Sequence, residues 1–209
     1  MRRQSVIFLT VFLMVVLFLT GCGNSVGESN QTDQVQEDSA ESKNSYEYVT
    51  EGGKFTQSVE STLENIDKRM DGECAFHTLQ DGLSVYVRWV DDQEINTVVS
   101  CNKSDGKTPV DSADEVPGGL VIGTQQPTGE LNEFTINGIV YVLQTLNADL
   151  ASDNSLYDKV NGMATEVEAM KKDLGEGGFS EGTIGDFDVT LLTQKSEDGM
   201  LVLFMIDPK

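Results

Sequence analysis

Residues 156–174 repeat their apolar side chains at the spacing of one face of a helix. Ser155 and Asp158 form a short capping box at its start, and Gly175 suits the left-handed position that follows a helix end. An amphipathic helix needs a second surface on which to bury its apolar stripe, so this segment requires a packing partner. The repeated positions are Leu156, Val160, Met163, Val167, Met170 and Leu174.

A second segment with helical periodicity lies at the start of the globular part. Its apolar positions are again three or four residues apart, and Gly72 marks its end. We therefore expect two amphipathic helices. The positions of the second are Phe55, Val59, Leu63, Ile66 and Met70.

Strand patterns fill most of the remaining chain. Apolar and polar residues alternate along 83–89 and 187–191, which predicts half-buried strands, and Asp91-Asp92 turns the first of them into 95–100. Residues 200–206 are apolar throughout, which predicts an interior strand that is covered on both faces or closed into a tight core.

A β-hairpin is predicted between the two helices. The runs 133–136 and 139–143 flank Asn137-Gly138, the dipeptide most typical of a two-residue hairpin turn. Together these elements indicate an α+β fold, in which two amphipathic helices pack on one antiparallel sheet. Residues 51–209 have the size of a single domain.

The N-terminus carries several features that follow one another in the order of a leader peptide. Arg2 and Arg3 precede a run, 6–19, that is apolar except for Thr10, and Leu19-Thr20-Gly21-Cys22 follows. This arrangement resembles the signal peptide of bacterial lipoproteins, and its last four residues resemble their lipobox. The resemblance implies that residues 1–21 are removed and that Cys22 carries thioether-linked lipid and acyl chains such as palmitate. The mature protein is then expected on the extracytoplasmic face of the cell membrane.

Residues 22–50 are expected to be the lipidated cysteine and a disordered acidic tether. Residues 23–50 contain no Leu, Ile, Phe or Trp and are rich in Ser, Asn, Gln, Glu and Asp. Such a composition buries too little apolar surface to offset the entropy of ordering.

The chain is strongly acidic, with 14 Lys and Arg against 35 Asp and Glu and a formal charge of −21. Loss of Arg2 and Arg3 would change this to −23, since −21 minus 2 is −23. This charge argues against a nucleic-acid partner, which is held by cationic side chains. It permits a cationic ligand or a protein partner, although solubility alone is a sufficient reason for it.

Cys74 and Cys101 remain after Cys22 is assigned to the lipid. An even pair in an oxidising compartment predicts a disulfide, and two free thiols are the alternative. A plain meander of strands near 74–79, 83–90 and 95–101 would place the two cysteines at opposite ends of the outer strands. The disulfide and that meander are therefore incompatible.

Motifs of catalysis or cofactor binding are weak, so we expect no cofactor and no catalytic or metal site. Residues 178–182 match G-x-S-x-G as a string, but the helix precedes the serine and the strand follows it, the reverse of a nucleophile elbow. Cys74, His77 and Cys101 offer three soft ligands where structural zinc needs four. The glycine-rich segments 118–129 and 175–185 are expected to be loops that form a recognition edge.

Two acidic clusters are candidates for calcium, but the first does not match the EF-hand order of ligands, the second lies in a Pro- and Gly-containing loop, and surface acid clusters are mostly solvated. They are Asn147, Asp149, Asp153 and Asp158, and Asp111, Asp114 and Glu115.

The function we expect is that of a lipid-anchored extracytoplasmic binding or interaction domain. An exposed apolar patch around Trp89 or Phe179 would favour it. The alternatives are a hydrolase that uses two facing carboxylates and an accessory subunit of a cell-envelope complex.

Overall fold

A computed structural model describes residues 46–90, 94–127, 129–174, 177–197 and 199–209. They belong to one unit that runs from Tyr46 to Lys209. The predictions for the leader, Cys22, the tether up to residue 45, Asp91-Asp92 and Gly175 concern positions outside the described residues.

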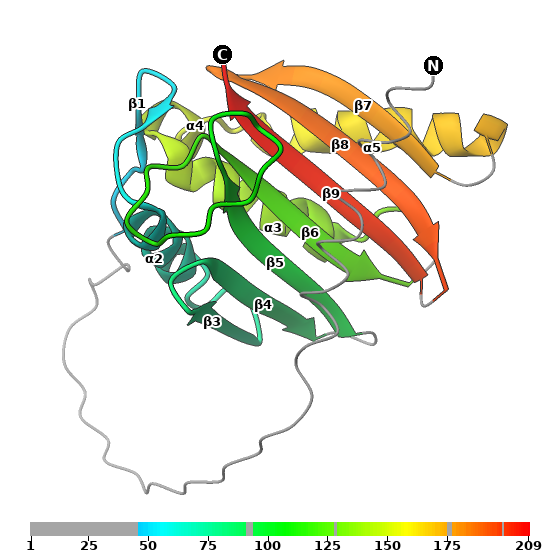
Figure 1. Ribbon diagram of the computed structural model, residues 1–209. Coiled ribbons are helices and arrows are strands. Elements are labelled where there is room, and N and C mark those ends of the chain that lie inside the picture. The colour runs from blue at the N-terminus through cyan, green and yellow to red at the C-terminus, as the bar shows by residue number, and fades with distance from the viewer. Residues whose placement is uncertain (1–45, 91–93, 128, 175–176, 198) are drawn as a thin grey trace, which may run out of the picture. The chain divides into compact units, whose positions relative to one another are not determined.

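Two antiparallel meanders form a single seven-stranded sheet in the order β3-β4-β5-β6-β9-β8-β7 (Figure 1). The pairing of β6 with β9 joins them. A small hairpin, β1 (Thr50–Glu51) and β2 (Lys54–Phe55), precedes the sheet. The sheet strands are β3 (Phe76–Gln80), β4 (Ser84–Val90), β5 (Glu94–Asn102), β6 (Gly119–Gln126), β7 (Gly177–Ile184), β8 (Phe187–Ser196) and β9 (Gly199–Pro208).

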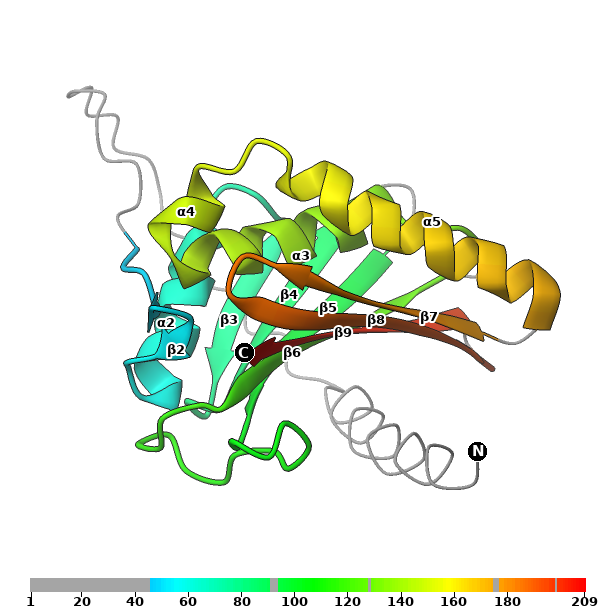
Figure 2. The same cartoon turned by 90° about the horizontal axis from the view of Figure 1, so that it is seen from above.

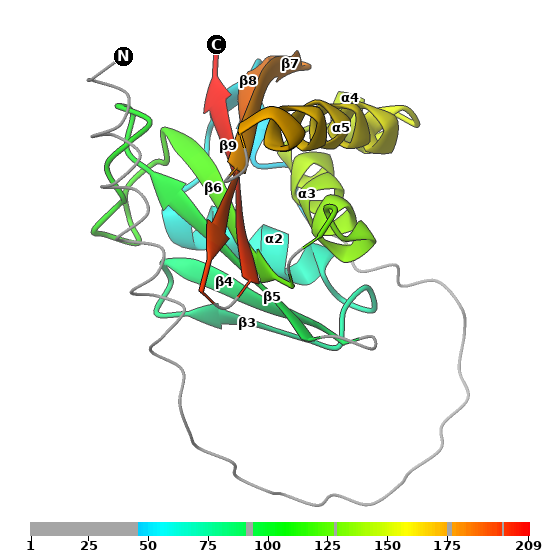
Figure 3. The same cartoon turned by 90° about the vertical axis from the view of Figure 1, so that its right-hand side faces the viewer.

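The described helices lie on one face of this sheet, as the two turned views show (Figure 2, Figure 3). They are α2 (Val59–Arg69), α3 (Glu133–Leu146), α4 (Ala148–Ala151) and α5 (Leu156–Leu174). The opposite face, which carries no described helix, is called the open face below. The predicted α+β class, a single domain with helices packed on an antiparallel sheet, is confirmed.

Both predicted amphipathic helices are present. The Ser58 side chain caps α2 by accepting a hydrogen bond from the Ser61 amide at 3.2 Å, and Gly72 follows the helix with φ of +77°. Phe55 belongs to β2 and lies just before α2. At the start of α5, Asp153 accepts from the Ser155 amide at 2.9 Å. Asp153 therefore organises this end, where the sequence predicted a Ser155–Asp158 box.

The predicted hairpin around Asn137-Gly138 is wrong, because 133–146 form the helix α3. The Asn132 side chain accepts from the Phe134 amide at 2.8 Å and starts the helix there. α3 lies between α2, α5 and the sheet, so apolar residues surround it on nearly every side. A short run without polar positions does not distinguish a buried helix from a buried strand. The prediction of strands therefore depended on the dipeptide Asn137-Gly138, which here lies inside a helix.

The two glycine-rich segments contain strands where loops were predicted. Residues 119–126 form the central strand β6, and residues 177–184 form β7 at the sheet edge. Their glycines allow close approach: a Cβ on Gly119 would lie 2.5 Å from the Asp207 carboxylate, and one on Gly178 would lie 2.6 Å from the Val167 carbonyl oxygen of α5. The glycines therefore reflect dense packing of a strand and do not indicate a turn.

Replacement of Gly138 by Leu should destabilise the fold by about 1–3 kcal/mol, because a side chain there overpacks the core. Even a Cβ at Gly138 would meet the Trp89 ring at 3.1 Å. Gly162→Leu is the matched control, since nothing lies within 4 Å of its Cβ position on α5. The control should gain up to about 1 kcal/mol from helix propensity. Urea unfolding measures both changes, and equal stability of the two variants would contradict the placement of α3.

Candidate functional site

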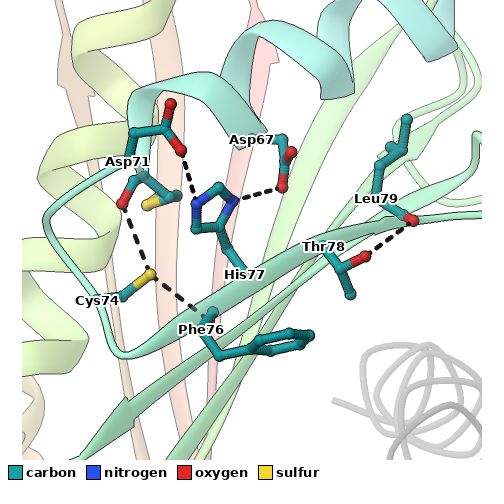
Figure 4. Close-up of polar contacts among 8 residues, drawn as sticks. Asp67, Asp71, Cys74, Phe76, His77, Thr78 and Leu79 are labelled. Atoms are coloured by element: carbon teal, nitrogen blue, oxygen red, sulfur yellow. Dashed lines mark hydrogen bonds and ion pairs between the residues drawn. The ribbon is translucent and has the colours of Figure 1, made fainter. Parts of the chain in front are cut away.

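Among the described residues, one histidine, two carboxylates and one thiol lie close together around the turn between α2 and β3 (Figure 4). Asp67 belongs to the last turn of α2, Asp71 and Cys74 lie in the turn that follows, and His77 lies on β3. We call these four residues the His77 cluster. The contacts of His77 with Asp67 and Asp71 were not predicted, although these two carboxylates are four residues apart and therefore project from the same side of a helical turn.

Both ring nitrogens of His77 face carboxylates. Nδ1 lies 2.8 Å from Asp67 Oδ1, and Nε2 lies 2.8 Å from Asp71 Oδ1. Both ring nitrogens are therefore within hydrogen-bond distance of a carboxylate, and neither faces a nucleophile. The cluster links the end of α2 to β3.

Cys74 has the properties of an unactivated thiol. Burial is the main cause that raises its pKa, and the nearby charges of Asp67, Asp71 and Glu73 raise it further. The thiol is 3.5 Å from the Phe76 carbonyl oxygen and 3.6 Å from that of Met70. A reactive cysteine needs a lowered pKa and a cationic neighbour that stabilises its thiolate. These four residues therefore do not form a Cys–His catalytic pair.

The predicted disulfide between Cys74 and Cys101 is not formed, and both residues are free cysteines. The strands β3, β4 and β5 form a plain meander, which is incompatible with the bond. Cys74 precedes β3 beside Arg88, because the Ala75 amide donates to the Arg88 carbonyl, whereas Cys101 lies near the far end of β5. Burial raises the pKa of the Cys101 thiol to about 12.

The other motif residues have structural roles. Ser180 of the G-x-S-x-G string is buried on β7 and donates to Glu166 of α5 at 2.6 Å, which ties the edge strand to its covering helix. Trp89 was expected in an exposed patch, and it is 1% exposed. Its ring stacks on Phe134 at a centroid distance of 6.0 Å, and its indole N–H donates to Thr97 at 3.2 Å. The expected patch at Trp89 is therefore wrong.

The acidic clusters are occupied by local contacts. Lys103 is 3.0 Å from Asp111, and Asn147 caps α4 through the Leu150 amide at 2.9 Å. The pKa of Asp153 is lowered to about 2, chiefly by its hydrogen bond from Lys159. Among the described residues, no group of three or more His, Cys, Asp or Glu side chains has metal-holding geometry.

The second candidate site is the open face, which an apolar row crosses from one strand to the next. Cross-strand partners share a face of an antiparallel sheet, so the pairings define the row directly. Phe179 at one end is 43% exposed. The row runs Phe179, Leu192, Leu203, Gly123, Val98 and Tyr86.

Several side chains of the open face are buried, although they belong to no part of the helix-side core. Val121, Leu192, Leu201 and Leu203 are each 3–8% exposed. The described helices all pack on the other face, so no described helix accounts for this burial. The prediction that residues 200–206 are covered on both faces or closed into a tight core agrees with this pattern.

One end of the open face is acidic. Asp188 on β8 pairs in register with Asp207 on β9, and burial together with the Asp188 charge raises the pKa of Asp207. The segment between β5 and β6 projects on this side of the sheet (Figure 3), and its Gly106 packs against the Asp207 carboxylate. This pair is one described arrangement of two neighbouring acids, as the hydrolase alternative requires.

Comparisons with protein-family models, with curated proteins and with solved structures found no match for this chain. No described helix is both long enough and apolar enough to cross a bilayer.

Thiol chemistry tests the free cysteines. In a chain that begins at residue 23, Cys101 should not react with a thiol reagent at pH 8, because its pKa of about 12 and its burial keep it protonated and shielded. Half-buried Cys74 should react slowly. After unfolding without reductant, both thiols should titrate. If almost no thiol titrated after unfolding without reductant, the two cysteines would be disulfide-bonded and this description would be wrong.

Proposed function

We propose that this chain is a lipid-anchored binding domain, held on the extracytoplasmic face of the cell membrane through Cys22, and that its open face binds a protein of the cell envelope. The anchor rests on the leader's resemblance to lipoprotein signals, from Arg2 and Arg3 to the Leu19-Thr20-Gly21-Cys22 sequence. Two or more acyl chains give stable attachment, so the domain would stay at the membrane without a spanning helix.

The observation that supports binding most is the exposed Phe179 at the end of the apolar row on the open face, whose central members Leu192 and Leu203 are buried. Exposed apolar side chains that gather on one surface commonly mark interaction sites. Phe179, at 43%, and Phe76, at 46%, are exposed at the two ends of the sheet. Aromatic side chains of this kind are enriched where proteins bind one another.

The His77 cluster favours binding over catalysis. Its histidine has both nitrogens engaged at 2.8 Å, and its thiol has a raised pKa. The hydrolase alternative would depend on Asp188 and Asp207, and the accessory-subunit alternative would use the same open face in a permanent complex.

Chemical crosslinking of the acylated protein in intact cells tests this function. We expect a specific crosslinked partner that Phe179→Ser abolishes, because the substitution removes the exposed end of the apolar row. Tyr157→Ser is the matched control: Tyr157 is a 36% exposed aromatic on α5, away from the open face, and its loss should leave the crosslink intact.

Membrane fractionation in the same experiment tests the anchor. Cys22→Ser should release the protein from the membrane fraction, because it removes the sulfur that carries the lipid. Crosslinks that survive Phe179→Ser, or membrane retention that survives Cys22→Ser, would contradict the corresponding half of the proposal.

A further inference from the structure

The Asp207 carboxylate lies against the loop that joins β5 to β6. A Cβ placed on Gly106 of that loop would lie 3.1 Å from Asp207 Oδ1, and one on Gly119 of β6 would lie 2.5 Å from the same oxygen. Because both residues are glycines, their backbones approach the carboxylate where side chains would crowd it. Gly106 also has φ of +65°, a conformation that glycine adopts without strain. The loop and the strand therefore leave Asp207 half-buried.

A second carboxylate, that of Asp188, stands beside the first. Asp188 is the cross-strand partner of Asp207, so both side chains lie on the open face, where like charges directly opposite each other are unfavourable. Asp188 is exposed and accepts a hydrogen bond from the Thr183 hydroxyl at 3.3 Å. Burial is the main cause that raises the pKa of Asp207, and the Asp188 charge raises it further. An ionised Asp207 is thus unfavourable while the loop covers it.

Two lysines near Asp207 have other partners. Lys103, in the loop, lies 3.0 Å from Asp111. Lys209, two residues after Asp207, donates through Nζ to the Gly185 carbonyl oxygen at 3.0 Å. Neither contact compensates the charge of Asp207.

The part of the loop that carries Gly106 is its tip, residues 103–110. The following part is fastened to the start of α2, since the Ala113 and Glu115 carbonyls accept from the amides of Glu60 and Val59 at 3.0 and 2.7 Å. Two hydrogen bonds join the tip to the end of β5. The Val110 amide donates to the Cys101 carbonyl at 3.2 Å, and the Asn102 side-chain amide donates to the Gly106 carbonyl at 3.3 Å.

The tip itself keeps one charge state over the acidic and neutral range. Asp105 accepts hydrogen bonds from the amides of Lys107 and Thr108 at 2.9 and 2.8 Å. Hydrogen bonds from Thr108, with that from the Lys107 amide, lower the pKa of Asp105 to about 2. A change in the position of the tip between about pH 4.5 and pH 7.5 is therefore attributed to Asp207 and not to Asp105.

We propose that the tip of the β5–β6 loop is a proton-controlled strap, which closes on Asp207 when its carboxyl group is protonated and lifts when that group is ionised. The sign follows from linkage: a carboxyl group whose pKa is higher in the closed state binds a proton on closure, so acid favours closure. The stabilisation of the closed state is complete below the ordinary pKa of an aspartate and is lost as pH rises through the raised pKa of Asp207. This inference concerns a movement within the domain and does not depend on the proposed binding function.

Hydrogen exchange followed by NMR tests the strap, in the mature chain with Cys22→Ser. The reporters are the Val110 amide and the Asn102 side-chain amide, whose hydrogen bonds break when the tip lifts from β5. After correction for the intrinsic effect of pH on exchange, we expect their protection to be at least about twofold greater at pH 4.5 than at pH 7.5. The Lys159 amide at the start of α5 is the reference that removes changes in global stability.

Three carboxylate variants assign the effect. Asp207→Asn should keep both reporters at or above their acid protection at every pH, because the amide is never ionised. Asp188→Asn should reduce the pH dependence without abolishing it, since burial is the larger cause of the raised pKa. The control Asp149→Asn, at an exposed carboxylate on α4, should leave the pH dependence unchanged.

An NMR titration of the Asp207 carboxyl carbon tests the same coupling from the other side. Gly106→Ala should lift the tip and move the pKa of Asp207 back toward its ordinary value, because coupling between closure and protonation is reciprocal. Circular dichroism verifies that each variant is folded. Reporter protection that does not change with pH, a pH dependence that survives Asp207→Asn, or an unchanged Asp207 pKa in folded Gly106→Ala would overturn the proposal.

Discussion

The pairing of β6 with β9 is the interaction on which the rest of this structure depends. It runs from Leu120 opposite Ile206 to Gln126 opposite Met200 and joins two meanders that are separated in sequence by three helices. The same pairing places two apolar strands at the centre of the sheet. Every second residue of β9 faces the helices, as Val202 and Phe204 do, and the residues between them face the other side.

That arrangement explains why one face of the sheet is covered by the described helices and the open face is not. On the helix side, α3 fills the space between α2, α5 and the strands, and Gly138 lets it approach Trp89. Two pairs of buried polar groups lie on this side: Thr97 and Thr124 are 2.9 Å apart, and Gln126 accepts from the Thr135 hydroxyl at 2.8 Å. On the open side, Leu201 and Leu203 are equally apolar but have no described helix over them. The difference between the two faces is the physical basis of the proposed binding function.

The periodicity of apolar residues correctly predicted the helices and strands that have one solvent-exposed side and one buried side. α5 occupies the predicted 156–174, and β4 and β8 follow the predicted alternation. It failed for α3, because burial on nearly all sides removes the polar positions that reveal a helix. It failed for β6 and β7 because glycine was interpreted as a turn signal, whereas Gly119 and Gly178 serve close packing.

The candidate sites were harder to predict, because they depend on pairing between segments distant in sequence. The apolar row needs the register of six strands before Phe179 and Tyr86 are recognised as members of one surface. An exposed apolar patch was predicted around Trp89 or Phe179, and Phe179 is indeed exposed. For the cysteines, the sequence allowed either a disulfide or a plain meander of strands, because the two are incompatible. The strand pairings show the meander, and both cysteines are free.

Side-chain oxidation by hydroxyl radicals tests most directly whether the open face is covered in the cell. The measurement compares the acylated protein in intact cells with the purified mature chain, at Phe179 and Met205 on the open face and at Tyr157 on α5. We expect Phe179 and Met205 to be protected in cells and oxidised after purification, and Tyr157 to be oxidised equally in both. Equal oxidation of Phe179 and Met205 in the two samples would contradict it.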